Sequence, residues 1–248
     1  RAIIGRALLT ARPSRGASFV PMHCTGDTAP SARVDTLVSS RVDPISGQPA
    51  LKMARASVTR HVAKAHGFLV SATRPRGLPF TYWAMAKAEG GYRLEFAGGP
   101  PAEGWETWLR HSLQLQDHHE FSGYMDQRAG VHRLLAFEGG RLMAGLFVSS
   151  VPVSGSRPWA VDQLRESHPD RSARSMLIAG RPAAGRPDKG AIVCSWFSVG
   201  INQINTAARG GCRSVEAIGA ALSAGTNCGS CRPEIRRILD ATQPIAAE

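Results

Sequence analysis

Residues 225–231 read GTNCGSC, and this stretch places Cys228 and Cys231 in a loop that also contains two glycines. Glycine has no side chain, so the backbone of such a loop can lie close to whatever the two sulfurs bind. The segment that follows, 232–239, predicts a helix, because a proline lies in its first turn and its apolar residues recur at helical spacing. The positive end of that helix favours anionic thiolates. The stretch therefore predicts a metal site at the start of a helix.

Two further helices are predicted upstream of this loop. Apolar residues recur at helical spacing in 201–208 and in 215–222, and a Gly-Gly break and the capping residue Ser214 separate the two segments. A helical unit of about fifty residues buries little apolar surface and usually needs a metal or a disulfide to fold alone. Cys194 precedes the first helix, so we expect the helices to bring its thiolate to those of the loop.

The segments IVCSWFSVG at 192–200 and AGTNCGSC at 224–231 resemble the 2Fe-2S domain of the bacterioferritin-associated ferredoxin type. They are most similar to the copy of this domain at the carboxyl end of the catalytic subunits of bacterial assimilatory nitrate reductases. The ligands of that family are a C-x-C pair followed by a C-x-x-C pair. The resemblance implies that the metal ligands here are Cys194, Cys228 and Cys231.

Trp196 stands where the family has its remaining cysteine ligand. An all-cysteine 2Fe-2S cluster needs four thiolates, and an indole cannot ligate iron. Cys212 is the other cysteine nearby, and it lies at a predicted turn that does not obviously aim it at the site. Three interpretations stay open, which are a 2Fe-2S cluster, a zinc ion held by the three cysteines and water, and a helical relic with free thiols.

The composition narrows the class of protein. The chain has 248 residues, of which 43% are hydrophobic and 20% charged, as in ordinary soluble globular proteins, and no apolar run is long enough to span a membrane. Five cysteines, an odd number, fit a reducing cytoplasm better than a disulfide framework. The net charge of +11 allows nucleic-acid binding, but the arginines are scattered through predicted turns. We expect a basic surface that docks an acidic electron donor, with no nucleic acid and no membrane as partner.

Residues 1–60 are predicted to be rich in β-structure. Ile3–Leu9 and Ser18–Met22 predict two strands, and Lys52–Thr59 predicts a further extended segment. Between them, Ser31–Val38 predicts a short amphipathic segment. By composition alone the region is a β-rich segment with long loops.

Three stretches of this region, GASFVPMH, SARVDTL and DPISGQPALK, resemble the last part of the molybdopterin dinucleotide-binding domain of the same nitrate reductases. In that family the domain is a double-psi-type β-barrel whose loops hold a guanylyl pterin arm around molybdenum. The resemblance implies contacts to molybdopterin guanine dinucleotide from His23, Thr25, Asp35 and Lys52. A histidine or a lysine can donate to the anionic oxygens of such a group. The alternative is that these residues serve the fold of their loops.

Residues 61–187 predict an α+β spacer that resembles the corresponding region of the nitrate reductases. The predicted elements are a strand at 67–71, a helix or strand pair at 81–89 and 92–96, a helix at 105–115, a β-hairpin of 131–137 and 141–148, and a helical segment at 161–177. A Pro/Gly-rich linker follows at 179–187. His118-His119-Glu120 has the composition of a metal site, but adjacent histidines on one helix point in different directions, so we favour no metal there.

The predicted fold class is α+β, with a partial β-barrel-type pterin-binding segment at 1–60, a spacer at 61–187 and a small helical iron-sulfur-type module at 188–240. The resemblance implies a fragment of a molybdenum-dependent oxidoreductase that reduces nitrate to nitrite in the cytoplasm. Its electron donor is then a ferredoxin, a flavoprotein or a reductase subunit. The isolated chain is expected to be inactive, because it lacks the body that encloses molybdenum and binds nitrate. The alternatives are a stand-alone or degenerate ferredoxin-like electron-transfer module and a basic binding domain without a redox role.

Overall fold

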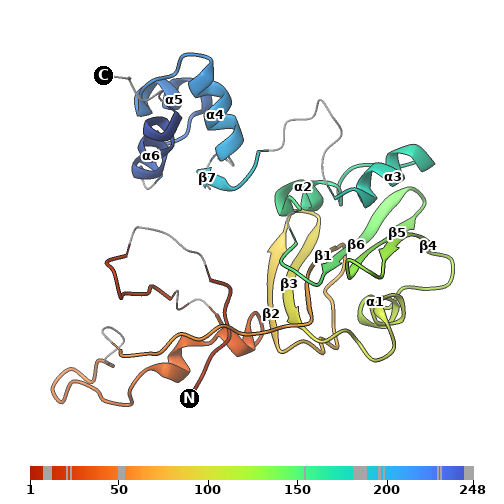
Figure 1. Ribbon diagram of the computed structural model, residues 1–248, viewed down its shortest axis with the longest axis horizontal. Coiled ribbons are helices and arrows are strands. Elements are labelled where there is room, and N and C mark those ends of the chain that lie inside the picture. The colour runs from red at the N-terminus through yellow and green to blue at the C-terminus, as the bar shows by residue number, and fades with distance from the viewer. Residues whose placement is uncertain are drawn as a thin grey trace. The chain divides into compact units, whose positions relative to one another are not determined.

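The computed structural model describes residues 1–7, 13–20, 22, 24–49, 54–153, 155–180, 189–194, 197, 199–227, 229 and 231–242. The chain forms two compact units, Arg1–Ile178 and Ala179–Glu248 (Figure 1). Among the described residues, no helix is both long enough and apolar enough to cross a membrane.

The first unit is built on a six-stranded antiparallel sheet with the strand order β2-β3-β1-β6-β5-β4. The strands are β1 (Ala65–Ser71), β2 (Tyr82–Ala88), β3 (Gly91–Gly98), β4 (Glu120–Asp126), β5 (Val131–Glu138) and β6 (Arg141–Ser149). Strands β1 and β6 are central and pair with each other, whereas β2 and β4 form the edges. The strand at 67–71 and the β5–β6 hairpin are therefore confirmed, and of the two alternatives left open for 81–89 and 92–96 the structure shows the strand pair.

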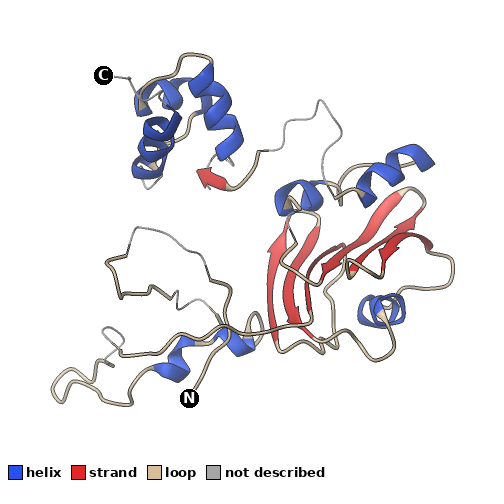
Figure 2. Cartoon of the chain, viewed as in Figure 1, coloured by secondary structure: helices blue, strands red, loops and turns tan. Residues whose placement is uncertain are grey.

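Helices cover both faces of this sheet (Figure 2). Successive side chains of a strand point to opposite faces, and β1 accordingly buries Leu69 in one apolar cluster and Phe68 and Val70 in another. Helix α1 (Trp105–Leu113) packs on the Leu69 face. Helices α2 (Arg157–Asp162) and α3 (Arg171–Ile178) contribute to the cluster on the other face. A sheet buried on both sides gives this unit two layers of core.

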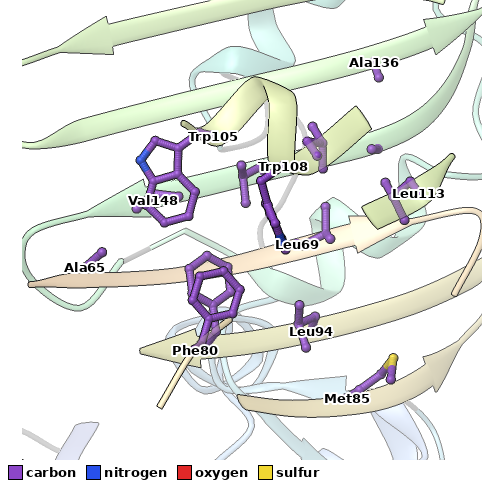
Figure 3. Close-up of a cluster of buried hydrophobic side chains, with 14 residues drawn as sticks. Ala65, Leu69, Phe80, Met85, Leu94, Trp105, Trp108, Leu113, Ala136 and Val148 are labelled. Atoms are coloured by element: carbon purple, nitrogen blue, oxygen red, sulfur yellow. The ribbon is translucent and has the colours of Figure 1, made fainter. Parts of the chain in front are cut away.

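Aromatic side chains fill the core under α1 (Figure 3). The rings of Phe80 and Phe96 are stacked with centroids 4.0 Å apart, and the Trp108 ring meets the Phe80 ring edge-on at 5.1 Å. The indole Nε1 of Trp108 donates a hydrogen bond of 3.0 Å to the carbonyl oxygen of Gly77, so its polar atom is satisfied inside the core. The helix predicted at 105–115 is confirmed, and its apolar side chains face the core.

Two predictions for this unit are wrong. The helical segment expected at 161–177 is divided into α2 and α3, and Pro169 lies between them; a proline disfavours continuation of a helix through the residue before it. Strand β4 was not predicted, and the preceding His118-His119 pair was placed on a helix. The sequence of β4, EFSGYMD, contains a glycine and has three exposed residues besides its first, so its strand conformation comes from pairing with β5.

The described part of residues 1–60 contains two short 3₁₀ helices, η1 (Pro30–Ala32) and η2 (Val34–Leu37), at the predicted amphipathic segment. No strand is assigned in the described residues of Ile3–Leu9 and Ser18–Met22, so the two strand predictions are wrong there. An extended segment becomes a strand only when a neighbour supplies ladder hydrogen bonds. The antiparallel α+β class is confirmed for the chain, whereas the barrel-type segment and the division at residue 60 stay predictions.

A partly buried ion pair joins α2 to the sheet. The guanidinium of Arg157 donates to both carboxylate oxygens of Glu95, at 2.9 and 3.2 Å, and the two side chains are only 14% and 16% exposed. The same guanidinium donates to the carbonyl oxygens of Val153 and Gly155 and lies 4.3 Å from the centroid of the Phe68 ring. Arg157 therefore ties the start of α2 to β3 and β1.

We expect Arg157→Met to lower the free energy of unfolding of this unit by about 3 kcal/mol, because Glu95 is left buried with less compensation. Arg6, 3.3 Å from the same carboxylate, offsets part of the loss. The matched control is Arg165→Met, since Arg165 is 53% exposed and pairs with surface carboxylates; this change is expected to cost less than about 1 kcal/mol. Urea denaturation followed by tryptophan fluorescence measures both, and equal losses contradict the prediction.

The second unit is a small helical module with one two-stranded ribbon. It contains β7 (Ile192–Cys194), β8 (Val199–Gly200), α4 (Ile201–Arg209), α5 (Val215–Leu222) and α6 (Arg232–Thr242). The predicted helices are confirmed, and the side chain of Ser214 accepts a hydrogen bond of 3.1 Å from the backbone N–H of Ala217, as expected of a cap. Ile204, Ile218 and Ile235, one from each helix, meet in a single apolar core.

Candidate functional site

Two cysteines, one before α4 and one before α6, meet in the core of the helical module. Cys194 is the last residue of β7 and is 3% exposed, and Cys231 directly precedes α6 and is 6% exposed. The two side chains share a hydrogen bond. They are far apart in sequence, so the packing of α4, α5 and α6 brings them together. The prediction that the helices return Cys194 to the loop is confirmed for Cys231.

Local backbone structure fixes the position of Cys231. Its carbonyl oxygen accepts a hydrogen bond of 2.9 Å from the N–H of Ile235, so Cys231 is the residue that starts α6. The loop before it turns at Gly225, whose φ of +83° lies in the left-handed region that glycine adopts at little steric cost. A Cβ at this glycine would lie 3.1 Å from Cγ of Arg232. Gly225 therefore allows the turn of this loop, whereas close approach of the loop to a group bound by the sulfurs stays a prediction.

Burial raises the pKa of the Cys231 thiol, and the adjacent Cys194 side chain raises it further. Hydrogen bonds with the backbone of Cys231 and Gly225 act in the opposite direction. Burial and the neighbouring thiol both disfavour a thiolate at Cys231. The pair of thiols therefore favours the protonated form as long as no cation lies between the two sulfurs. A bound metal ion reverses this preference, since a ligating thiol is deprotonated.

Of the remaining positions discussed for this site, the structure describes Cys212 but not the third predicted ligand, Cys228. Cys228 and Trp196 lie outside the described residues. Cys212 is partly buried and packs against the same apolar core. Among the described side chains, however, the one set of three His, Cys, Asp or Glu donor atoms within 4.8 Å of one another is elsewhere, at His118, His119 and Glu138. Cys212 therefore does not complete a set of three sulfurs.

Of the predicted pterin contacts, His23 and Lys52 lie outside the described residues. Thr25 has a local partner, because its Oγ1 lies 2.9 Å from Oγ1 of Thr28. Asp35 accepts from the guanidinium of Arg33 at 2.6 Å, and this hydrogen bond lowers the pKa of the Asp35 carboxyl group. Such local contacts agree with the alternative interpretation, in which these side chains stabilise the conformation of their own loops and do not contact a pterin. Pterin binding by the four residues stays a prediction.

His118 and His119 do not lie on a helix, so the premise of the prediction for them is wrong. They lie in a turn before β4, and their ring centroids are 4.4 Å apart. Glu120, which the sequence grouped with them, instead forms an ion pair with Arg174. The carboxylate near the two imidazoles belongs to Glu138, which sequence analysis missed because only the strand pairing brings it there.

Comparison with known proteins supports the predicted relationship. Residues 192–241 match the family model of the BFD-like 2Fe-2S binding domain. The carboxyl-terminal module thus matches a 2Fe-2S domain. The chain is also 33% identical over 229 residues to a nitrate reductase of Klebsiella oxytoca, across 91% of this chain and 25% of that protein. The chain therefore spans about a quarter of the curated relative it matches. No solved structure matches the chain.

By residue type, the BFD-like module has a cysteine at three of the four positions where the resemblance implies ligands of a 2Fe-2S group. Cys194 and Cys231 are in contact, and Cys228 completes the C-x-x-C pair in the sequence. The fourth position holds Trp196, which has no atom that can ligate iron. The donor set is thus all thiolate, which suits iron-sulfur chemistry, but it is one cysteine short.

Proposed function

We propose that this chain is the carboxyl-terminal part of a molybdenum-dependent assimilatory nitrate reductase and that its BFD-like module relays electrons. The observation that carries the proposal is the buried contact between Cys194 and Cys231 in the segment that matches a 2Fe-2S domain. Cys194, Cys228 and Cys231 would hold the cluster, with solvent in place of the fourth cysteine. When bound, the cluster supplies one-electron transfer.

The residues of the module then have distinct tasks. Cys194 and Cys231 hold the site inside an apolar core, which limits the access of water to it. The backbone of Gly225 and Cys231 forms hydrogen bonds to the Cys231 sulfur and favours its anionic form. Hydrogen bonds to ligand sulfurs raise the reduction potential of such centres. The loop that carries the C-x-x-C pair would thus both bind the cluster and adjust its reduction potential.

We further propose that residues 1–60 belong to a pterin-binding domain in the cytoplasmic enzyme, with His23, Thr25, Asp35 and Lys52 near the molybdopterin guanine dinucleotide. The support is the identity of 33% to a nitrate reductase, which extends over 91% of the chain. The net charge of +11 supports an acidic electron donor, because opposite charges speed diffusional encounter. Nitrate binding is then a task of the enzyme beyond this chain.

The test uses the complete enzyme that contains this chain and compares two rates of nitrate reduction. One rate uses the reduced protein donor, and the other uses a reduced viologen, a small reductant that can reach other redox centres. We expect Cys231→Ser to lower the ratio of the first rate to the second towards zero, because the relay is interrupted. Cys212→Ser is the matched control and is expected to keep the ratio. An unchanged ratio in Cys231→Ser refutes the relay.

If the complete reading frame contains no molybdenum-binding body, the same module is instead a ferredoxin-like electron-transfer domain without catalytic activity of its own. A reduced protein donor then still reduces the module, but no nitrite forms. This outcome separates a failure of the nitrate reductase assignment from a failure of the electron-relay assignment.

A further inference from the structure

The turn between α1 and β4 places two imidazoles side by side. The backbone N–H of His119 donates a hydrogen bond of 3.2 Å to the carbonyl oxygen of Gln116, which closes the turn. The rings of His118 and His119 are stacked, with centroids 4.4 Å apart and an angle of 29° between their planes. Adjacent residues in a helix or a strand do not present their side chains in this way. The turn thus creates a pair of neighbouring nitrogen donors.

Strand pairing adds a carboxylate to this pair. In the β4–β5 register Glu120 is opposite Phe137, so the chain before Glu120 runs beside Glu138. Nε2 of His118 lies 3.0 Å from Oε1 of Glu138. One donor atom from each of His118, His119 and Glu138 lies within 4.8 Å of the others. The three groups converge from a turn and from the end of a strand.

We propose that His118, His119 and Glu138 bind a divalent transition-metal ion of the zinc class. Two imidazoles and one carboxylate are a common ligand set for such an ion, with water in the remaining position. The ion would replace the proton shared between His118 and Glu138. The site is independent of the cysteine module and of the proposed nitrate reductase activity.

Backbone contacts to Gln116 hold the ring of His119 in place. The backbone N–H of Gln116 donates a hydrogen bond of 3.1 Å to Nδ1 of His119, which also lies 3.1 Å from the carbonyl oxygen of Gln116. Metal binding through Nε2 requires the tautomer in which Nδ1 carries the proton and donates to this carbonyl, and this tautomer gives up the contact from the N–H. Metal-ligating histidines commonly donate their other ring N–H to a carbonyl or a carboxylate, and this contact fixes the tautomer and the ring orientation.

The surroundings of the three side chains indicate a moderate affinity of the site for the metal ion. The side chains of His118 and Glu138 are 60% and 52% exposed, so water ligands have access. Arg141 is opposite Glu138 in the β5–β6 register, and its positive charge makes the potential at the site less negative. Arg174 forms an ion pair with Glu120 instead. A bound ion would link the turn at 116–119 to the end of β5. It would thereby fasten β4, one of the two edge strands of the sheet.

The test is protection of individual histidines from diethyl pyrocarbonate in the full chain, read by mass spectrometry during a titration with Zn²⁺. Residue-level detection separates this site from any zinc taken up by the cysteines. We expect Zn²⁺ to protect His118 and His119 but not His111, an exposed histidine on α1. Glu138→Gln should raise the zinc concentration for half-protection by about tenfold or more, because one charged ligand is lost.

Glu89→Gln is the matched control, since Glu89 is an exposed glutamate at the turn of another hairpin, and it is expected to leave the protection unchanged. The proposal is overturned if zinc does not slow the modification of His118 and His119, if His111 is protected to the same extent, or if Glu138→Gln behaves as the unaltered chain does. Circular dichroism of both variants confirms that the sheet unit stays folded.

Discussion

Cys231→Ser is expected to remove almost completely the chromophore of the iron-sulfur cluster that we propose for this module. After anaerobic reconstitution with iron and sulfide, the unaltered chain should absorb visible light and give a paramagnetic signal when reduced, whereas the variant should bind iron near the background level. The physical reason is the ligand count, because three cysteines already leave the cluster one thiolate short. A hydroxyl in place of the buried Cys231 thiol removes a second soft donor, and two thiolates do not retain two irons.

Cys212→Ser is the matched control for this experiment. Cys212 packs against the same core but forms no three-donor set with Cys194 and Cys231, so its loss should leave the iron content unchanged. Trp196→Cys restores the family pattern and is expected to slow loss of the cluster to a chelator. A chain that stays colourless and gains colour only with Trp196→Cys would contradict the proposal that three cysteines suffice. Equal iron loss in Cys212→Ser and Cys231→Ser would contradict the assignment of ligands.

Gly200→Ala is expected to destabilise the cysteine module strongly while the sheet unit keeps its stability. A Cβ at position 200 would lie 1.8 Å from the carbonyl oxygen of Lys189 and 2.5 Å from its carbonyl carbon. That oxygen accepts a hydrogen bond of 3.1 Å from the N–H of Asn202, so it cannot move away without loss of a contact at the start of α4. Gly200 also pairs with Ile192, two residues before Cys194.

The magnitude of this effect follows from the size of the module. Overpacking against a fixed backbone costs about 3 kcal/mol, and a module of about fifty residues has only about 5 kcal/mol of stability in total. Most of the folded population should therefore be lost under mild denaturing conditions. Hydrogen exchange read by mass spectrometry measures each unit separately, and the peptides of α4, α5 and α6 should lose protection.

Gly210→Ala is the control for this change. Gly210 ends α4 with a φ of −75°, and a Cβ there would have its nearest neighbours at 3.4 Å, the carbonyl oxygens of Thr206 and Ala207. An alanine fits at this position with little adjustment, so the exchange of the module should change little. The prediction fails if the two variants exchange alike, or if Gly200→Ala leaves the module protected.

Prediction from the sequence succeeded where the signal was local. The apolar spacing of 201–208 and 215–222 gave α4 and α5, and the Glu-Gly-Gly turn gave the β5–β6 hairpin. The position of Cys194 before these helices predicted its contact with Cys231. The role of the cysteines as a ligand set stays a prediction. The contact itself needed only that three short helices pack together.

Prediction failed where one segment takes its structure from another. Strand β4 has an exposed, partly polar sequence that favours no single conformation, and its hydrogen bonds to β5 make it a strand. The strands predicted at Ile3–Leu9 and Ser18–Met22 contain apolar residues, but their described parts, 3–7, 18–20 and 22, have no assigned ladder partner among the described residues. The local sequence pattern of a segment contains no information about which other strand it will pair with.

The sequence by itself determined the helical cysteine module, the central hairpin and the deficit of one cysteine ligand, because periodicity, turn residues and ligand identity are properties of short segments. Only the tertiary structure decided that two helical layers enclose the sheet and that Glu138 meets His118 and His119. Those contacts join residues distant in the chain, and they form only when burial of the whole core compensates the entropy of bringing such segments together.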